Sequence, residues 1–192
     1  DPSAEADHTI EKPAQYDRWR NFEPAMTPPY GGRLIEWMYP IPWTLKQNRC
    51  QLFPVEDSVL PLFSYRQIVS RDRFTDPKVH DVTIVNWPQN DYFVTNIIDQ
   101  PAEIVAKALE ESRQLTLSLI YWLQTEQGYR GLYLRPDITG TSDGLAKYPY
   151  IRESRRIRAA FTVTEDHVGT KARYGDNPLT NPNDFSRLAE PF

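Results

Sequence analysis

The chain has 192 residues, 40% of them hydrophobic, which suits one domain with a sizeable core and room for a small appendage. Its net charge of -4 at pH 7 argues against a nucleic-acid-binding surface as its main role. The most apolar run, 115–123, is about half the roughly 18 residues that span a bilayer, so we expect no transmembrane segment and a soluble, cytoplasmic or periplasmic location.

Proline and aromatic content indicate the fold class. The chain has 17 prolines but only 8 glycines, which is typical of stiff, extended connections with few tight turns. Its 5 tryptophans and 11 tyrosines indicate aromatic packing. We expect an α+β fold with a mixed or antiparallel sheet, one long buried helix and many proline-rich loops. A single domain should cover residues 16–168, after a disordered or extended arm (1–15) and before an irregular segment (169–192).

Four segments have the residue pattern of strands. Residues 33–39 (RLIEWMY) and 81–87 (DVTIVNW) are rich in aliphatic and aromatic side chains, and the latter is the clearest candidate for a central strand. Part of 59–69 is predicted as a strand with an edge position or an irregular entry, because Pro61 cannot donate a ladder hydrogen bond. The run 156–164, rich in isoleucine, phenylalanine, valine and threonine, is the fourth.

A polar segment follows the strand predicted at 81–87. Asn86, Asn90 and Asp91 fall at or just beyond its end, where loop side chains often meet ligands. Asparagine and aspartate side chains also bond to their own backbone in turns. Both roles stay open at this point, so these residues are candidates for ligand contact and for turn formation alike.

The strongest helix pattern begins at about Pro101 and runs to residues 124–126. Asp99 or Gln100 is suited to cap it, and Pro101 is suited to its first helical position. Apolar residues recur at helical spacing, and the second half, LTLSLIYWL (115–123), is apolar nearly all round. We therefore predict a helix whose second half is deeply buried.

Three arginines and a glutamate lie close together just before and at the start of the fourth predicted strand. In an extended segment Arg152 and Arg156 would point to one side, and Glu153 and Arg155 to the other. A guanidinium group keeps its charge and is costly to bury alone, so at least one of these arginines should meet a carboxylate, a phosphate or a polar ligand. A solvated or internally paired edge satisfies the same requirement, and both remain open.

Other catalytic signatures are weak or absent. Cys50 is the only cysteine, so no internal disulfide can form, and without a histidine nearby in sequence we expect a buried rather than a nucleophilic thiol. Glu165, Asp166 and His167 are adjacent but no second cluster supports them, so we expect no metal site. The sequence contains no GxGxxG, Walker, GxSxG, HExxH or CxxC motif.

Four blocks of the sequence together resemble a known family. They are YDRWRNFEPA-x-x-PPYGGRL (16–34), DVTIVNWPQNDY (81–92), YWLQTE (121–126) and PYIRESRRI-x-A-x-x-TVTEDHV (149–168). These blocks resemble large bacterial FAD-dependent oxidoreductases, and NWPQND and RESRR are the most specific. The resemblance is to the central part of such proteins, since their Rossmann-type FAD-binding unit and C-terminal FAD-contacting segment have no counterpart here.

The resemblance implies that FAD carries the redox chemistry, while this region positions the substrate and excludes water. The arginines of RESRR would orient an anionic or hydroxyl-rich substrate or stabilise negative charge on reduced flavin, and its glutamate would fix an arginine. The polar residues of NWPQND would hydrogen-bond the substrate. The candidate substrate- or flavin-facing residues are Arg152, Glu153, Arg155, Arg156, Asn86, Asn90 and Asp91.

We therefore expect the substrate-binding or cap portion of an FAD-dependent oxidoreductase. It would act on a small molecule together with a complementary FAD-binding chain or a larger assembly, and would bind no cofactor alone. Two other functions also fit the composition. One is a non-enzymatic module that binds a carbohydrate or a partner protein through aromatic and arginine-rich loops. The other is a scaffold subunit built on proline-rich extended segments.

Overall fold

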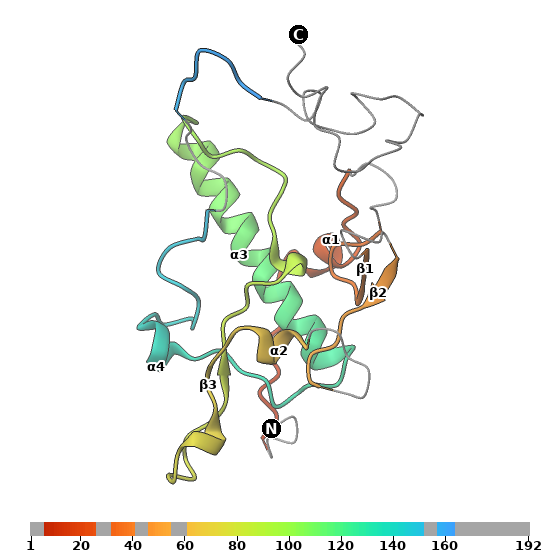
Figure 1. Cartoon of the computed structure of the whole chain (residues 1–192), viewed down its shortest axis with the longest axis vertical. Coiled ribbons are helices and arrows are strands. Elements are labelled where there is room, and N and C mark those ends of the chain that lie inside the picture. The colour runs from red at the N-terminus through yellow and green to blue at the C-terminus, as the bar shows by residue number, and fades with distance from the viewer. Residues whose placement is uncertain (1–5, 26–31, 41–45, 55–60, 152–156, 164–192) are drawn as a thin grey trace, which may run out of the picture. The chain divides into compact units, whose positions relative to one another are not determined.

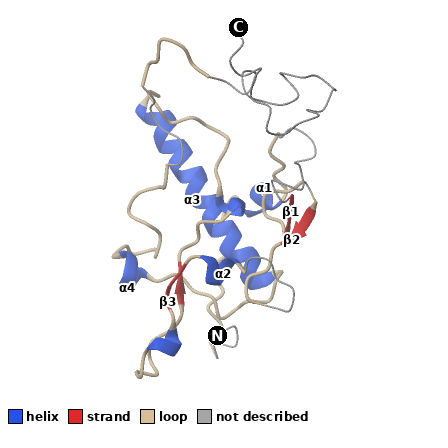
Figure 2. Ribbon diagram, viewed as in Figure 1, coloured by secondary structure: helices blue, strands red, loops and turns tan. Residues whose placement is uncertain are grey.

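The computed structural model of the chain describes residues 6–25, 32–40, 46–54, 61–151 and 157–163 (Figure 1). Two compact units divide the chain, at residues 1–151 and 152–192. All described helices and strands belong to the first unit. Short antiparallel strand pairs, one long helix and many loops make the fold α+β, as predicted (Figure 2).

The long helix is α3, Ala102–Thr125, whose 24 residues confirm the predicted element. Leu115, Leu119 and Leu123 are fully buried, because the apolar second half of the helix is surrounded by the rest of the unit. Its first half is more open, and Ile104 lies exposed there. No helix in the described ranges is long and apolar enough to cross a membrane.

The start of α3 differs from the prediction by one position. Pro101 is the N-cap residue, with φ -54° and ψ 148°, rather than the first helical residue. Neither Asp99 nor Gln100 therefore caps the helix, and no side chain bonds to its free backbone N–H groups at the cap. Asp99 instead has a φ of 56°, the left-handed conformation that aspartate tolerates in turns.

A short helix, α1 (Tyr16–Arg20), packs against α3 and supplies the centre of the core. Trp19 is fully buried among the leucines of α3 and aromatic residues of other segments. Aromatic pairs hold this region together, with Trp37 and Trp122 at a ring-centroid distance of 5.0 Å. The aromatic packing expected from composition is thus present in the core, and Tyr16 of α1 meets Tyr121 of α3 edge to face at 4.8 Å.

The strands are few and short. β1 (Met38–Pro40) pairs with β2 (Gln47–Arg49), and β3 (Gln67–Val69) pairs with β4 (Val82–Thr83), both antiparallel. The register of β3 and β4 shifts between Gln67 and Val69, as in a β-bulge. The remaining elements are single helical turns: α2 (Leu62–Tyr65), the 3₁₀ turns η1 (Arg71–Arg73) and η2 (Pro88–Asn90), and α4 (Pro136–Thr139).

The predicted strands were too long. The one expected at 81–87 ends at Thr83, because the Asn86 N–H donates to the Ile84 carbonyl at 2.9 Å and turns the chain. Within the described part of 59–69, residues 62–65 form α2 and the only strand is β3, while Pro61 forms an isolated parallel bridge with Gln51. Of 33–39, only Met38 and Tyr39 belong to a strand, which pairs with β2.

The strand predicted at 156–164 is also absent over its described residues, 157–163. Each of these seven residues is exposed, and Ile157 leaves 94% of its surface open to solvent. The described strands pair only with one another, β1 with β2 and β3 with β4. Strand-forming residues alone were therefore insufficient to predict a strand here.

The N-terminal arm is attached to the rest of the unit over its described part. Gln124, fully buried in α3, donates through Nε2 to the carbonyls of His8 and Leu132, both at 2.8 Å. Its Oε1 accepts from the Ile10 N–H at 3.0 Å. One glutamine thus joins the arm, the last turns of α3 and the segment that follows the helix.

Candidate functional site

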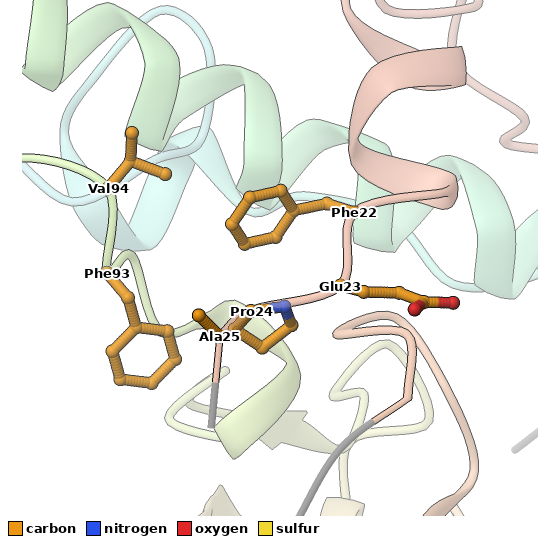
Figure 3. Close-up of a pocket in the computed structure, with 6 residues that line it drawn as sticks. All are labelled: Phe22, Glu23, Pro24, Ala25, Phe93 and Val94. Atoms are coloured by element: carbon orange, nitrogen blue, oxygen red, sulfur yellow. The ribbon is translucent and has the colours of Figure 1, made fainter. Parts of the chain in front are cut away.

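A pocket of about 460 Å³ opens between two loops of the first unit (Figure 3). Residues 22–25, which follow α1, form one wall, and residues 93–94, which follow η2, form the other. The lining residues are Phe22, Glu23, Pro24, Ala25, Phe93 and Val94.

The wall surfaces that face each other are apolar. Figure 3 shows the Phe22 ring directed toward the side of Phe93 and Val94, while the Glu23 carboxylate points away from them. Phe93 and Val94 are both exposed, so their side chains are not part of the hydrophobic core. Such a surface favours a flat aromatic or aliphatic group over a charged one.

The 22–25 wall is anchored on the core. The Phe22 N–H donates to the Trp19 carbonyl at 3.2 Å, and the Phe22 carbonyl accepts from the Leu34 N–H at 2.9 Å. The rings of Phe22 and Trp19 meet edge to face, with centroids 5.2 Å apart. The backbone of Phe22, where this wall begins, is therefore held by Trp19 on one side and by Leu34 on the other.

The 93–94 wall is anchored on α3 by two residues that shortly precede it, in η2 and its exit. Asn90 Oδ1 accepts from Thr116 Oγ1 at 2.7 Å. The Tyr92 hydroxyl donates to Glu111 Oε2 at 2.7 Å, and its ring meets Trp19 edge to face at 5.9 Å. The loop is thus attached to the helix on both sides of Asp91.

Glu111 is the charged centre of this region. It is buried on α3, and it receives Arg18 of α1 through two guanidinium nitrogens, at 3.0 and 3.4 Å, as well as the Tyr92 hydroxyl. The hydrogen bonds from Arg18 and then from Tyr92 hold the pKa of Glu111 below its ordinary value. Burial raises the pKa of Tyr92, and its bond to Glu111 adds to this. Glu111 is therefore a carboxylate at neutral pH.

A second cluster of the same composition lies at the end of α3. Glu126 accepts from Arg20 Nε at 3.0 and 3.1 Å and from the Tyr16 hydroxyl. Burial raises the pKa of Glu126, but the bonds from Arg20 and Tyr16 outweigh it, so the pKa lies below its ordinary value. Burial and the bond to Glu126 both raise the pKa of Tyr16. α1 is thus held by two Arg–Glu–Tyr clusters, defined as Arg18–Glu111–Tyr92 and Arg20–Glu126–Tyr16.

Some of the site residues predicted from the sequence lie in this region. Asn90 and Asp91 lie directly before the 93–94 wall, and Asn86 is half-buried at the turn after β4. The Asn90 side chain bonds within the protein, to Thr116 and, at 3.4 Å, to the Val85 carbonyl. Arg152, Glu153, Arg155 and Arg156 lie outside the described residues.

The pocket residues themselves were missed. The available signal was an apolar pair, Phe93–Val94, within an otherwise polar loop, and the aromatic–proline run Phe22–Ala25. Each signal is weak alone, because single apolar residues are common on protein surfaces. What makes the two runs a site is their proximity, which only the tertiary structure provides.

Two further expectations concern reactive and metal-binding groups. Cys50 is buried beside Gln89, whose Nε2 lies 3.3 Å from its sulfur, and burial raises the pKa of the thiol to about 11. Such a thiol is poorly suited to act as a nucleophile. Within the described residues, histidine, cysteine and acidic side chains form no group of three that would hold a metal ion. Glu165, Asp166 and His167 lie outside them.

Comparison with known proteins identifies the family. The family model described as FAD dependent oxidoreductase matches residues 6–177, which is most of the chain. No curated protein and no solved structure matches it. The matched range includes both walls of the pocket and both Arg–Glu–Tyr clusters. The family predicted from the four sequence blocks is confirmed: this chain belongs to the FAD-dependent oxidoreductase family.

Proposed function

We propose that this chain supplies the substrate-binding side of an FAD-dependent oxidoreductase, and that its pocket receives an apolar part of a small-molecule substrate. One observation carries the proposal. Both pocket walls belong to or directly follow blocks on which the family resemblance rests: Phe22–Ala25 end YDRWRNFEPA, and Phe93–Val94 follow NWPQNDY. A pocket built on these blocks is a natural place for the substrate of this family.

The described residues do not fit the pyrophosphate of FAD. Pyrophosphates are held by glycine-rich turns that lead into a helix N-terminus. The long helix of this chain is instead preceded by Asp99 and capped by Pro101, and its first turn carries Glu103. Carboxylates at that position repel a diphosphate. We therefore assign the flavin to a separate FAD-binding part, and propose that the chain alone takes up none and is inactive.

The residues of RESRR and NWPQND remain candidates for contact with the substrate or the flavin in this proposal. The arginines at 152, 155 and 156 would hold an anionic or hydroxyl-bearing part of the substrate, with Glu153 fixing one of them. Asn86 and Asp91 would bond polar groups of the substrate, and Asn90 would support the loop that carries Phe93. The substrate class that the pocket favours is a small molecule with an apolar part.

A direct test uses an uncharged fluorescent probe, N-phenyl-1-naphthylamine, with FAD as the comparison ligand. We expect the chain to bind the probe with saturable enhancement of its emission, and to retain no absorbance at about 450 nm after incubation with FAD and desalting. Phe93→Ser should abolish the saturable signal, since it removes half of the aromatic lining.

The matched control is Phe74→Ser. Phe74 is as exposed as Phe93, at 53% against 58%, but it follows η1 and does not line the pocket. It should leave probe binding unchanged. Equal loss in both variants, or no saturable binding by the unmodified chain, would show that the pocket is not a binding site. A persistent flavin band would contradict the need for a separate FAD-binding part.

The exposed tyrosines Tyr148 and Tyr150 favour a second function, a non-enzymatic carbohydrate-binding module. They leave 76% and 77% of their surfaces open, at alternate positions in one short segment. Exposed aromatic rings stack on sugar faces. Glycan binding that Tyr148→Ala and Tyr150→Ala abolish, with Phe93→Ser having no effect on it, would favour this module over the oxidoreductase proposal.

A further inference from the structure

Glu111 is the point at which the two walls of the pocket are connected. Arg18, four residues before Phe22, and Tyr92, directly before Phe93, both bond to its carboxylate. These two partners come from segments that are separated in sequence and meet at one side chain of α3. We infer that Glu111 is a positioning residue, which sets the spacing of the pocket walls and thereby the affinity for an apolar ligand. The inference rests on the proposed function of the pocket.

Burial and charge make the connection strong. Glu111 exposes 7% of its surface, so a lost partner is poorly replaced by water. Its two carboxylate oxygens have different principal partners, since Oε1 accepts from Arg18 at 3.0 Å and Oε2 accepts from Tyr92 at 2.7 Å. Bonds to an ionised acceptor are stronger than neutral ones, so the two walls are tied by the stronger class of hydrogen bond.

The second cluster provides a comparison within the same molecule. Glu126 also binds one arginine and one tyrosine, but Arg20 and Tyr16 both belong to α1. Glu126 therefore holds α1 alone, whereas Glu111 joins α1 to the loop of Tyr92. Arg18 and Arg20 are two positions apart, about 200° around the helix, so they reach different sides of α1. Both clusters contain one arginine, one glutamate and one tyrosine. Only the Arg18–Glu111–Tyr92 cluster contacts the segments that lead into both pocket walls.

The test measures the affinity of N-phenyl-1-naphthylamine for four variants of the full chain, at a temperature where each is folded by circular dichroism. Tyr92→Phe keeps the ring against Trp19 and removes only the hydroxyl. We expect it to weaken binding about fivefold, the factor that a typical net hydrogen bond represents. Glu111→Gln should weaken binding at least as much. Tyr16→Phe and Glu126→Gln should stay within about twofold of the unmodified chain.

Thermal melts of the same variants separate positioning from general stability. All four substitutions break a bond between α3 and a neighbour, so all should lower the melting temperature, while only the first two should lower affinity. If affinity falls in proportion to stability in all four, or is unchanged in Tyr92→Phe and Glu111→Gln while the unmodified chain binds the probe, the inference is wrong and the pocket proposal stands. Absence of binding by the unmodified chain overturns both.

Discussion

Replacing Gln124 by methionine should detach the N-terminal arm. Methionine has a similar length and suits a helix, but it offers no partner to the backbone groups of His8, Ile10 and Leu132. Three lost bonds at about 1 kcal/mol each, partly offset by the burial of an apolar side chain, lower the free energy of unfolding by about 2–3 kcal/mol. For a chain of this size that corresponds to a fall in Tm of about 4–12 °C.

Urea unfolding followed by tryptophan fluorescence measures the loss, and hydrogen exchange at Ile10 locates it, because that amide should lose its protection. Gln114→Met is the matched control on the same helix. Gln114 is half-buried, and its Oε1 accepts one longer bond, 3.3 Å from the Gln15 N–H, while its Nε2 donates to Glu110 at 3.0 Å in an exposed bond. We therefore expect the substitution to lower the free energy of unfolding by only about 1 kcal/mol. Equal costs for the two variants, or retained protection of Ile10 in Gln124→Met, would refute the reasoning.

Three further outcomes are expected. Gly144→Ala should lower the free energy of unfolding, measured by heat or urea, by about 2–4 kcal/mol, because φ is +74° and the new Cβ would lie 2.6 Å from Leu134 Cβ. Gly128→Ala, where φ is +81° and no atom lies within 4 Å of the new Cβ, should lower it by about 1 kcal/mol. Cys50 should react with Ellman's reagent only as fast as the chain opens, since its pKa is about 11, and rapid labelling of the native chain would contradict this. The raised pKa of Tyr16 means that the folded chain holds this proton more tightly than the unfolded chain. Stability should therefore fall as the pH rises above about 10, and Tyr16→Phe should flatten that decline in urea titrations.

The long helix could be predicted because its signal is local. The spacing of apolar residues over 102–125 and the apolar second half require no knowledge of the rest of the chain. Its start was predicted one position early, since Pro101 suits both the N-cap and the first helical position. The burial of Cys50 likewise followed from its residue type and surroundings.

The strands and the pocket depend on partners that are distant in sequence. Residues 82–85 are all β-branched, yet only Val82 and Thr83 belong to a strand. The bond between Arg18 and Glu111 joins positions 93 apart, and nothing in either local sequence indicates it. The pocket walls could therefore not be paired from the sequence, even though NWPQND, which directly precedes Tyr92, was singled out as specific.

The attachment of the arm through Gln124 has a consequence for synthesis of the chain. The carbonyl of His8 cannot form its hydrogen bond until Gln124, 116 residues later in the chain, has been synthesised. At about 5–20 residues per second, that interval lasts roughly 6–23 seconds on the ribosome. During that interval the apolar side chain of Ile10 cannot pack against the complete core. The arm must therefore dock among the last steps of folding, and we expect it to be the part of this unit most accessible to chaperones and proteases while translation proceeds.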